Sequence, residues 1–152
     1  MAQEFRLADG GLIDRGKPIS FTFNGKTLQG YQCDTLASAL RANGVHHVGR
    51  SFKYHRPRGI VTAGAEEPNA ILQLGRDPRT DPNMRATQTE LHSGLTAAPQ
   101  NCWPSLDYDL GAVNSKLSRF FPAGFYYKTF MWPANAWMTY EPCIRKPAGL
   151  GR

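Results

Sequence analysis

Hydrophobic and polar positions alternate near the start of the chain in a pattern that predicts a β-hairpin. In residues 19–23 (ISFTF) every second side chain is large and apolar, which is the period of a strand with one buried face. Asn24-Gly25 follows, and both residues readily adopt the positive φ that a two-residue hairpin turn requires. Residues 26–31 are therefore expected to form the return strand.

A short helix is expected after the hairpin. Residues 34–35 (Asp-Thr) can supply an N-cap, Leu36, Leu40 and Val45 outline an apolar face, and Asn43-Gly44 can end the helix. A hairpin followed by a helix across its face is how a β-grasp domain begins, although other α+β folds begin in the same way. The pattern therefore predicts an α+β fold and favours a β-grasp.

The pattern is less regular beyond the helix. Strands are expected at 69–74 and 84–91, on either side of a turn-rich loop that contains Asp-Pro twice. A short amphipathic helix is expected near 108–121, because apolar residues there recur at helical spacing. Its apolar positions are Leu110, Val113, Leu117 and Phe120.

The segment from Phe121 to the end has a different character, with eight aromatic residues and four prolines. Proline at this density disfavours a regular helix or a central strand. We expect an extended arm that packs its rings on a surface. That surface is either this same domain or a partner, and the pattern leaves both open.

Composition and charge narrow the class of protein. The chain has 152 residues, 41% of them hydrophobic, and a formal net charge of +6. This length fits one ordinary domain, and the charge favours acidic partners without choosing among nucleic acid, an acidic subunit and a phosphorylated cofactor. Neither a run of about 18 apolar residues nor a signal-peptide core is present, so a cytoplasmic protein is expected.

The cysteines do not suggest a disulfide framework or a zinc site. Cys33, Cys102 and Cys143 are odd in number, widely spaced and outside any C-x-x-C pair. We expect reduced, inert thiols.

Residues 46–59 (HHVGRSFKYHRPRG), called the basic tract below, are the first candidate binding site. Cations interleaved with aromatic rings suit single-stranded nucleic acid or a nucleotide phosphate. The plainer alternative is a loop whose charges meet acidic residues of a partner or face solvent, and the absence of an RNA-binding signature favours it.

Candidate catalytic chemistry is sparse. Glu66 and Glu67 are adjacent, so their side chains should diverge, and we expect both to be surface charges. The chain has no G-x-S-x-G, no P-loop and no G-x-G-x-x-G opening a helix. No catalytic residue is assigned.

Three long blocks cover nearly all of the chain, namely RLADGGLIDRGKPISFTFNGKTLQGYQCDTLASALRANGV, RSFKYHRPRGIVTAGAEEPNAIL and YYKTFMWPANAWMTYEPCIRKPAGLG. They resemble the N-terminal region of the alpha subunit of heterotetrameric sarcosine oxidase. In this family a dinucleotide-binding domain follows a segment like the last block. The resemblance therefore implies that the chain is a truncated product or an excised domain.

The same region is similar to ferredoxin-like domains that carry a [2Fe–2S] cluster on a C-x4-C-x2-C run after an RPRG stretch. That run falls on Thr62, Glu67 and Ala70, so its spacing is present without its thiolates. The resemblance thus implies a ferredoxin frame that holds no cluster and no metal. It also implies a domain division into an N-terminal tail (1–15), a degenerate ferredoxin-like β-grasp domain (16–95), and a helix with an extended arm (96–152).

The resemblance implies a function for the whole complex. Such complexes oxidise sarcosine to glycine with formation of hydrogen peroxide, and tetrahydrofolate takes up the one-carbon unit as methylene-tetrahydrofolate. The complex carries FAD, FMN and NAD, with the substrate flavin in the beta subunit, so this segment is expected to bind no cofactor. Its implied partners are the beta, gamma and delta subunits and the rest of the alpha subunit.

The implied role of this segment is structural, through contacts with the rest of the complex. Two alternatives stay open: a subunit of a related amine-, opine- or proline-oxidising flavoenzyme, and a stand-alone basic module that binds single-stranded nucleic acid. Large rings dominate interface energetics. The candidate interface residues are Arg50, Lys53, Tyr54, His55, Arg56, Arg58, Phe125, Tyr126, Phe130, Trp132 and Trp137.

Overall fold

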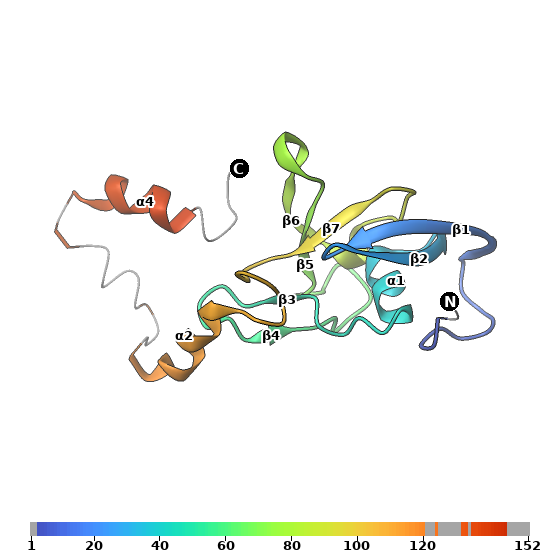
Figure 1. Cartoon of the computed structure of the whole chain (residues 1–152), viewed down its shortest axis with the longest axis horizontal. Helices are drawn as coiled ribbons and strands as arrows, with labels where there is room; N and C mark the ends of the chain where they lie inside the picture. The colour runs from blue at the N-terminus through green and yellow to red at the C-terminus, as the bar shows by residue number, and fades with distance from the viewer. Residues whose placement is uncertain (1–2, 121–123, 125–131, 134, 146–152) are drawn as a thin grey trace.

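The computed structural model describes residues 3–120, 124, 132–133 and 135–145 (Figure 1). Seven strands, three α-helices and four 3₁₀ turns lie in this part of the chain. The strands are β1 (Asp14–Phe23), β2 (Lys26–Gln32), β3 (Gly49–Arg50), β4 (Pro57–Arg58), β5 (Ile71–Leu74), β6 (Asp81–Arg85) and β7 (Thr96–Pro99). The helices are α1 (Leu36–Ala42), α2 (Val113–Lys116) and α4 (Trp137–Arg145), and the 3₁₀ turns are η1 (Asp77–Arg79), η2 (Ala86–Gln88), η3 (Leu110–Ala112) and η4 (Ser118–Phe120).

A mixed five-stranded sheet forms the centre of the fold, in the order β2-β1-β7-β5-β6. β1 and β7 are parallel, with Thr22 opposite Thr96, and the other three neighbouring pairs are antiparallel. β3 and β4 form a separate two-stranded sheet. The predicted α+β class is confirmed.

The first hairpin forms as its sequence predicts. Asn24 and Gly25 have φ of 49° and 77°, and the strands on either side pair from Phe23 with Lys26 back to Pro18 with Tyr31. Positive φ at both turn positions matches the twist of the two strands. The predicted hairpin is therefore confirmed, and β1 begins earlier than expected, at Asp14.

Helix α1 packs on the sheet and closes the core (Figure 1). Its N-cap is Thr35, whose Oγ1 accepts a hydrogen bond from the Ser38 N–H at 3.2 Å. The largest buried apolar side chains come from both layers, namely Phe21 and Leu72 of the sheet and Leu36 and Leu40 of the helix. This core fixes the position of the loop that enters β5.

Two predicted elements differ from the structure. The strand expected at 84–91 ends at Arg85, because Ala86–Gln88 turns inward and Ala86 and Thr87 are buried. The helix expected near 108–121 is divided into η3, α2 and η4. The Asp109 carboxylate accepts the Gly111 N–H at 3.2 Å, which begins that region with a 3₁₀ turn.

Residues on both sides of 16–95 contact the rest of the described fold. β7 covers residues 96–99, so the sheet continues past residue 95. Within residues 3–13, Phe5 packs edge-on against His46 and Arg6 pairs with the buried Asp34. No helix in the described part of the chain is long and apolar enough to cross a membrane.

Candidate functional site

The loop between β4 and β5 carries the three positions that match the cluster-ligand spacing. Glu67, expected at the surface, is instead fully buried, while its neighbour Glu66 is exposed. The prediction for Glu67 was wrong because the loop folds around its carboxylate. Oε2 of Glu67 accepts the N–H groups of Val61 and Thr62 at 2.8 and 2.6 Å, and Oε1 accepts those of Asn69 and Ala70 at 2.7 and 3.0 Å.

These hydrogen bonds decide the charge of Glu67. Burial by itself would raise its pKa, because a buried carboxylate loses its hydration. The backbone N–H groups of Thr62, Asn69, Val61 and Ala70 together outweigh burial and lower the pKa to about 2. Glu67 is therefore a buried anion at neutral pH.

The residues at this site do not fit a [2Fe–2S] cluster. Such a cluster needs four ligands, which are thiolates in ferredoxins. The resemblance places Thr62, Glu67 and Ala70 at three ligand positions, and the Thr87 side chain also reaches the loop, with its hydroxyl donating to the Gly64 carbonyl at 2.7 Å. None of these four has a thiol, and the described part of the chain holds no cluster of metal-ligating side chains.

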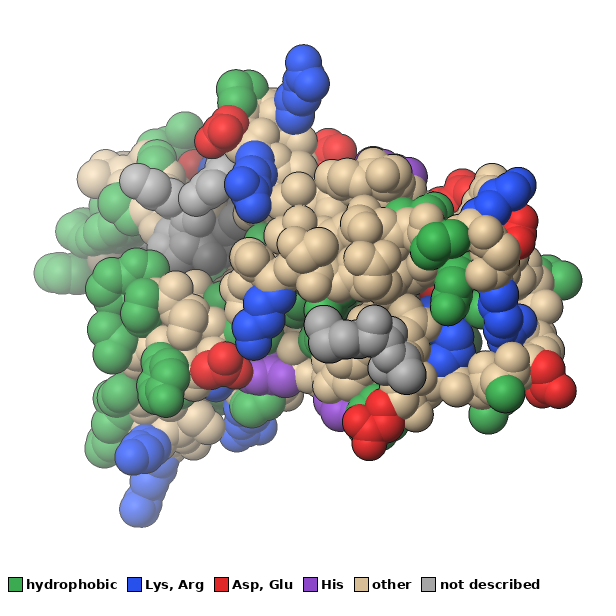
Figure 2. Space-filling model, turned by 45° about the vertical axis from the view of Figure 1, so that its right-hand side comes forward, with side chains coloured by type: hydrophobic (Ala, Val, Ile, Leu, Met, Phe, Trp, Pro, Cys, Tyr) green, Lys and Arg blue, Asp and Glu red, His purple; other side chains and the backbone are tan. Residues whose placement is uncertain are grey.

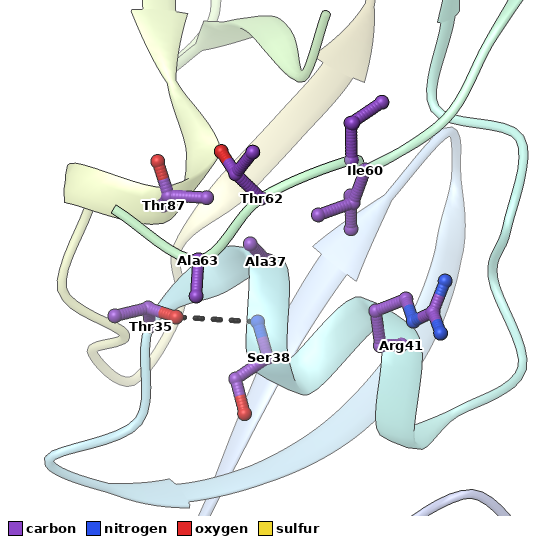
Figure 3. Close-up of a pocket in the computed structure, with 9 residues that line it drawn as sticks. Thr35, Ala37, Ser38, Arg41, Ile60, Thr62, Ala63 and Thr87 are labelled. Carbon is purple, nitrogen blue, oxygen red and sulfur yellow. Dashed lines mark hydrogen bonds between the residues drawn. The ribbon is translucent and has the colours of Figure 1, made fainter. Parts of the chain in front are cut away.

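A shallow hollow of about 390 Å³ lies beside the loop (Figure 3). Thr62, Ala63 and Thr87 line one side of it, and residues of α1 and its N-cap line the other. Thr35 faces the Ser38 N–H and is used as the cap. The hollow contains one charged lining residue, Arg41, and no acid, so it offers neither an acid–base pair nor a nucleophile with a base.

A second cluster joins the basic tract to residues 103–111. Nδ1 of His55 lies 2.7 Å from Oδ2 of Asp109, whose side chain is fully buried. The same carboxylate lies 3.5 Å from Nε of Arg50 and accepts the Trp103 N–H at 2.9 Å. Burial opposes its charge, but the Trp103 N–H, His55 and the Gly111 N–H together lower the pKa of Asp109.

Two residues of the basic tract, Arg50 and His55, therefore bind a carboxylate of this same chain. Arg50 is mostly buried and also donates two hydrogen bonds to the Leu106 carbonyl, at 3.0 and 2.9 Å. Arg56 and Lys53 lie over the Tyr54 ring, 4.7 and 5.0 Å from its centroid. The basic tract is thus a folded loop bound to its own domain through hydrogen bonds and ion pairs. The side chains of Arg56 and Arg58 remain exposed.

The aromatic candidates lie mostly outside the described residues. Phe125, Tyr126 and Phe130 lie outside the described residues. The side chains of Trp132 and Trp137 are described, and they are 79% and 42% exposed. Trp137 begins helix α4, which contains Pro142, so the expectation of an extended chain was wrong for residues 137–145.

An exposed apolar surface lies on η3, α2 and η4, formed by Leu110, Val113, Leu117 and Phe120 and called the apolar face below. Hydrophobic side chains gather at the end of the molecule that carries α2 (Figure 2). The helical spacing of these residues predicted one apolar stripe. In the structure the stripe faces outward, and all four side chains are exposed.

The three cysteines are free in the structure. Cys33 and Cys143 are exposed, and Cys102 is half-buried near Asp109. Burial, with the Asp109 carboxylate, raises the pKa of the Cys102 thiol. A raised pKa leaves this sulfur poorly nucleophilic.

Sequence reasoning missed Asp109 and Thr87. Asp109 precedes Leu110-Gly111, and an Asp two residues before a glycine is a common local turn signal, but it does not reveal a partner 54 positions away. Thr87 lies in a stretch that was expected to be a strand, which hid its turn toward the loop.

Comparison with a family model and comparison with curated proteins give consistent matches. A family model described as "2Fe-2S iron-sulfur cluster binding domain" matches residues 16–102. The chain is 62% identical over 149 residues to the sarcosine oxidase subunit alpha of Rhizobium meliloti (strain 1021), covering 97% of this chain and 15% of that protein. It is 40% identical over 91 residues to the subunit alpha of Corynebacterium sp. (strain U-96), covering 58% and 9%.

A solved structure is also similar. L-proline dehydrogenase from P. horikoshii matches with a TM-score of 0.44 and 25% identity, over 57% of this chain and 16% of that chain. The chain spans no more than about 15% of the curated relatives it matches.

Proposed function

The chain belongs to the family of 2Fe-2S iron-sulfur cluster binding domains, and from this premise we propose that it is the N-terminal part of a sarcosine oxidase alpha subunit. The sequence resemblance to these subunits is confirmed by 62% identity over 97% of the chain. Such an identity over almost every residue of this segment supports the same role in the same kind of complex.

The proposed activity belongs to the whole complex, an oxidoreductase acting on a CH–NH donor. It would oxidise sarcosine to glycine with oxygen as the oxidant, which is reduced to hydrogen peroxide, and would transfer the one-carbon unit to tetrahydrofolate. FAD, FMN and NAD would bind outside this segment. The partners would be the beta, gamma and delta subunits and the rest of the alpha subunit, in the cytoplasm.

Within that complex the segment would act as a β-grasp scaffold. The sheet order β2-β1-β7-β5-β6, with α1 packed across it, supports this architecture. The observation that carries the structural role is the buried Glu67 carboxylate at a cluster-ligand position. A site without thiolates has no means of carrying electrons, so the frame serves assembly.

The proposed contact surface has two parts. The exposed Arg56 and Arg58 of the basic tract would meet acidic groups of the complex. The aromatic arm and the apolar face would pack on the rest of the alpha subunit. Phe120 and Trp132, 74% and 79% exposed, would lose most of their solvent contact there.

The test is the native molecular mass of this polypeptide in its source cells, together with the proteins that copurify with it. Both are followed with peptides from Arg50 to Leu72. A species far heavier than 16.9 kDa that copurifies with flavin-bearing subunits and forms hydrogen peroxide from sarcosine is the expected result. A lone species of 16.9 kDa without sarcosine-dependent peroxide formation would contradict the proposal.

A further inference from the structure

In the loop from Gly59 to Ala70, four backbone N–H groups point toward one position inside the protein. Those of Val61 and Thr62 come from its first half, and those of Asn69 and Ala70 from its second half. Concave arrangements of backbone N–H groups bind anions, and many iron–sulfur sites are built in this way. The loop therefore has the donor geometry of an anion site.

The anion in this site is part of the chain. Each carboxylate oxygen of Glu67 accepts two N–H groups, and the Thr62 hydroxyl donates a further bond to Oε2 at 3.3 Å. The side chain is fully buried, so these donors replace the water that the carboxylate would otherwise bind. The structure thus shows a filled site, with its acceptor and donors matched.

The contacts coincide with the spacing of the cluster ligands. Thr62 and Ala70 stand at two of the three positions and supply a backbone donor each, and Glu67 stands at the third and supplies the acceptor. We propose that the Glu67 carboxylate replaces the iron–sulfur cluster as the anion that holds this loop, so that the ferredoxin frame keeps its shape without metal.

The replacement also explains how the loop stays coupled to the sheet. Ala70 is fully buried, and its carbonyl accepts the Ala86 N–H at 2.9 Å, next to the turn that carries Thr87. Without an acceptor, the N–H groups around Glu67 would be unpaired at buried or part-buried positions, and leaving such groups unpaired is costly. Loss of the anion should therefore loosen residues 61–70.

Hydrogen–deuterium exchange of the full-length subunit tests this directly, with peptides that cover 61–62 and 69–70. In Glu67→Ala both halves of the loop lose their acceptor, so their amides should exchange about tenfold faster or more. Glu66→Gln is the matched control, because Glu66 is adjacent and exposed, and it should leave residues 69–70 unchanged.

Glu67→Gln keeps the test decisive if the alanine variant does not fold. An amide has a single acceptor oxygen, so at least one half of the loop should lose protection. Protection of both halves at the wild-type level in this variant would overturn the proposal. The measured quantity is the local protection of backbone amides from exchange. The outcome for this proposal therefore does not depend on whether the complex oxidises sarcosine.

Discussion

The imidazole of His55 is hydrogen-bonded to the buried carboxylate of Asp109, with 2.7 Å between Nδ1 and Oδ2. The two residues lie 54 positions apart, so this contact closes a long loop and joins the basic tract to the segment before α2. The ring lies so close to Gly111 that a Cβ there would come within 2.2 Å of it. A glycine at 111 is therefore part of the same arrangement.

The first prediction concerns the charge of Asp109. Asp109→Asn keeps an acceptor for the Trp103 and Gly111 N–H groups but leaves the mostly buried Arg50 without its anion. Removing one member of a buried ion pair lowers the free energy of unfolding by about 3 kcal/mol or more. Arg50 keeps its hydrogen bonds to backbone carbonyls in this variant, so we expect a loss of about 3 kcal/mol. Urea unfolding measures the loss.

Asp107→Asn is the matched control for that substitution, because Asp107 is exposed and two residues away. It should change the free energy of unfolding by less than about 0.5 kcal/mol. Equal effects of the two variants would show that the Asp109 charge does not stabilise the fold.

The second prediction concerns the pH dependence of stability. The pKa of Glu67 is about 2 in the folded chain against an ordinary value of 4.5, so the folded state favours the ionised form. This contribution is complete above about pH 5 and is lost as the pH falls from there toward 2. The shift corresponds to about 3 kcal/mol.

Comparison of the wild type with Glu67→Gln isolates this group from the other carboxylates. The difference in free energy of unfolding should be largest near neutral pH and should shrink progressively below about pH 5. Urea titrations between about pH 7 and pH 3 measure it. A difference that stays constant over this range would mean that the carboxylate charge is not what the loop stabilises.

The third prediction concerns iron. The native chain should take up none when incubated anaerobically with iron and sulfide, because Thr62, Glu67, Ala70 and Thr87 have no thiol. A variant with cysteine at all four positions should bind about two irons per chain and give the electron paramagnetic resonance signal of a reduced [2Fe–2S] cluster.

The control for the iron experiment keeps Glu67 and changes the other three positions to cysteine. Its carboxylate should still occupy the four N–H donors, so it should bind much less iron than the four-cysteine variant. Equal uptake by both variants would show that Glu67 does not block the site.

Local patterns predicted the fold where local forces decide it. Alternation and an Asn-Gly turn were sufficient for β1 and β2, and Asp34-Thr35 was identifiable as the place of the α1 cap, which Thr35 supplies. The strand expected at 84–91 failed because burial of Ala86 and Thr87 against a distant loop overrides an alternating pattern. Periodicity contains no information on such a long-range contact.

The site was predictable in position but not in chemistry. The resemblance to ferredoxin-like domains placed Thr62, Glu67 and Ala70 at the ligand positions, yet Glu67 was expected at the surface because a carboxylate is usually exposed. Its burial depends on four N–H groups that converge only when the loop closes. Asp109 was missed for the same reason, since its partners Arg50 and His55 are distant in the sequence.

The fourth prediction concerns the apolar face on η3, α2 and η4. Leu110, Val113 and Phe120 are 62%, 54% and 74% exposed, so the 152-residue chain alone should self-associate as its concentration rises. Val113→Asp combined with Phe120→Asp should make it monomeric by sedimentation, because a charge at these positions opposes burial. In the full-length subunit the same pair should weaken the packing of this segment on the rest of the chain, detected as faster proteolysis.

Lys116→Glu adds a negative charge to the same helix at an exposed polar position and serves as the control. It should leave self-association unchanged, because it does not touch the apolar side chains that drive it. A native chain that stays monomeric at high concentration would show that the apolar face needs no partner. The role of this surface in assembly would then be wrong, while the arrangement around Glu67 would be unaffected.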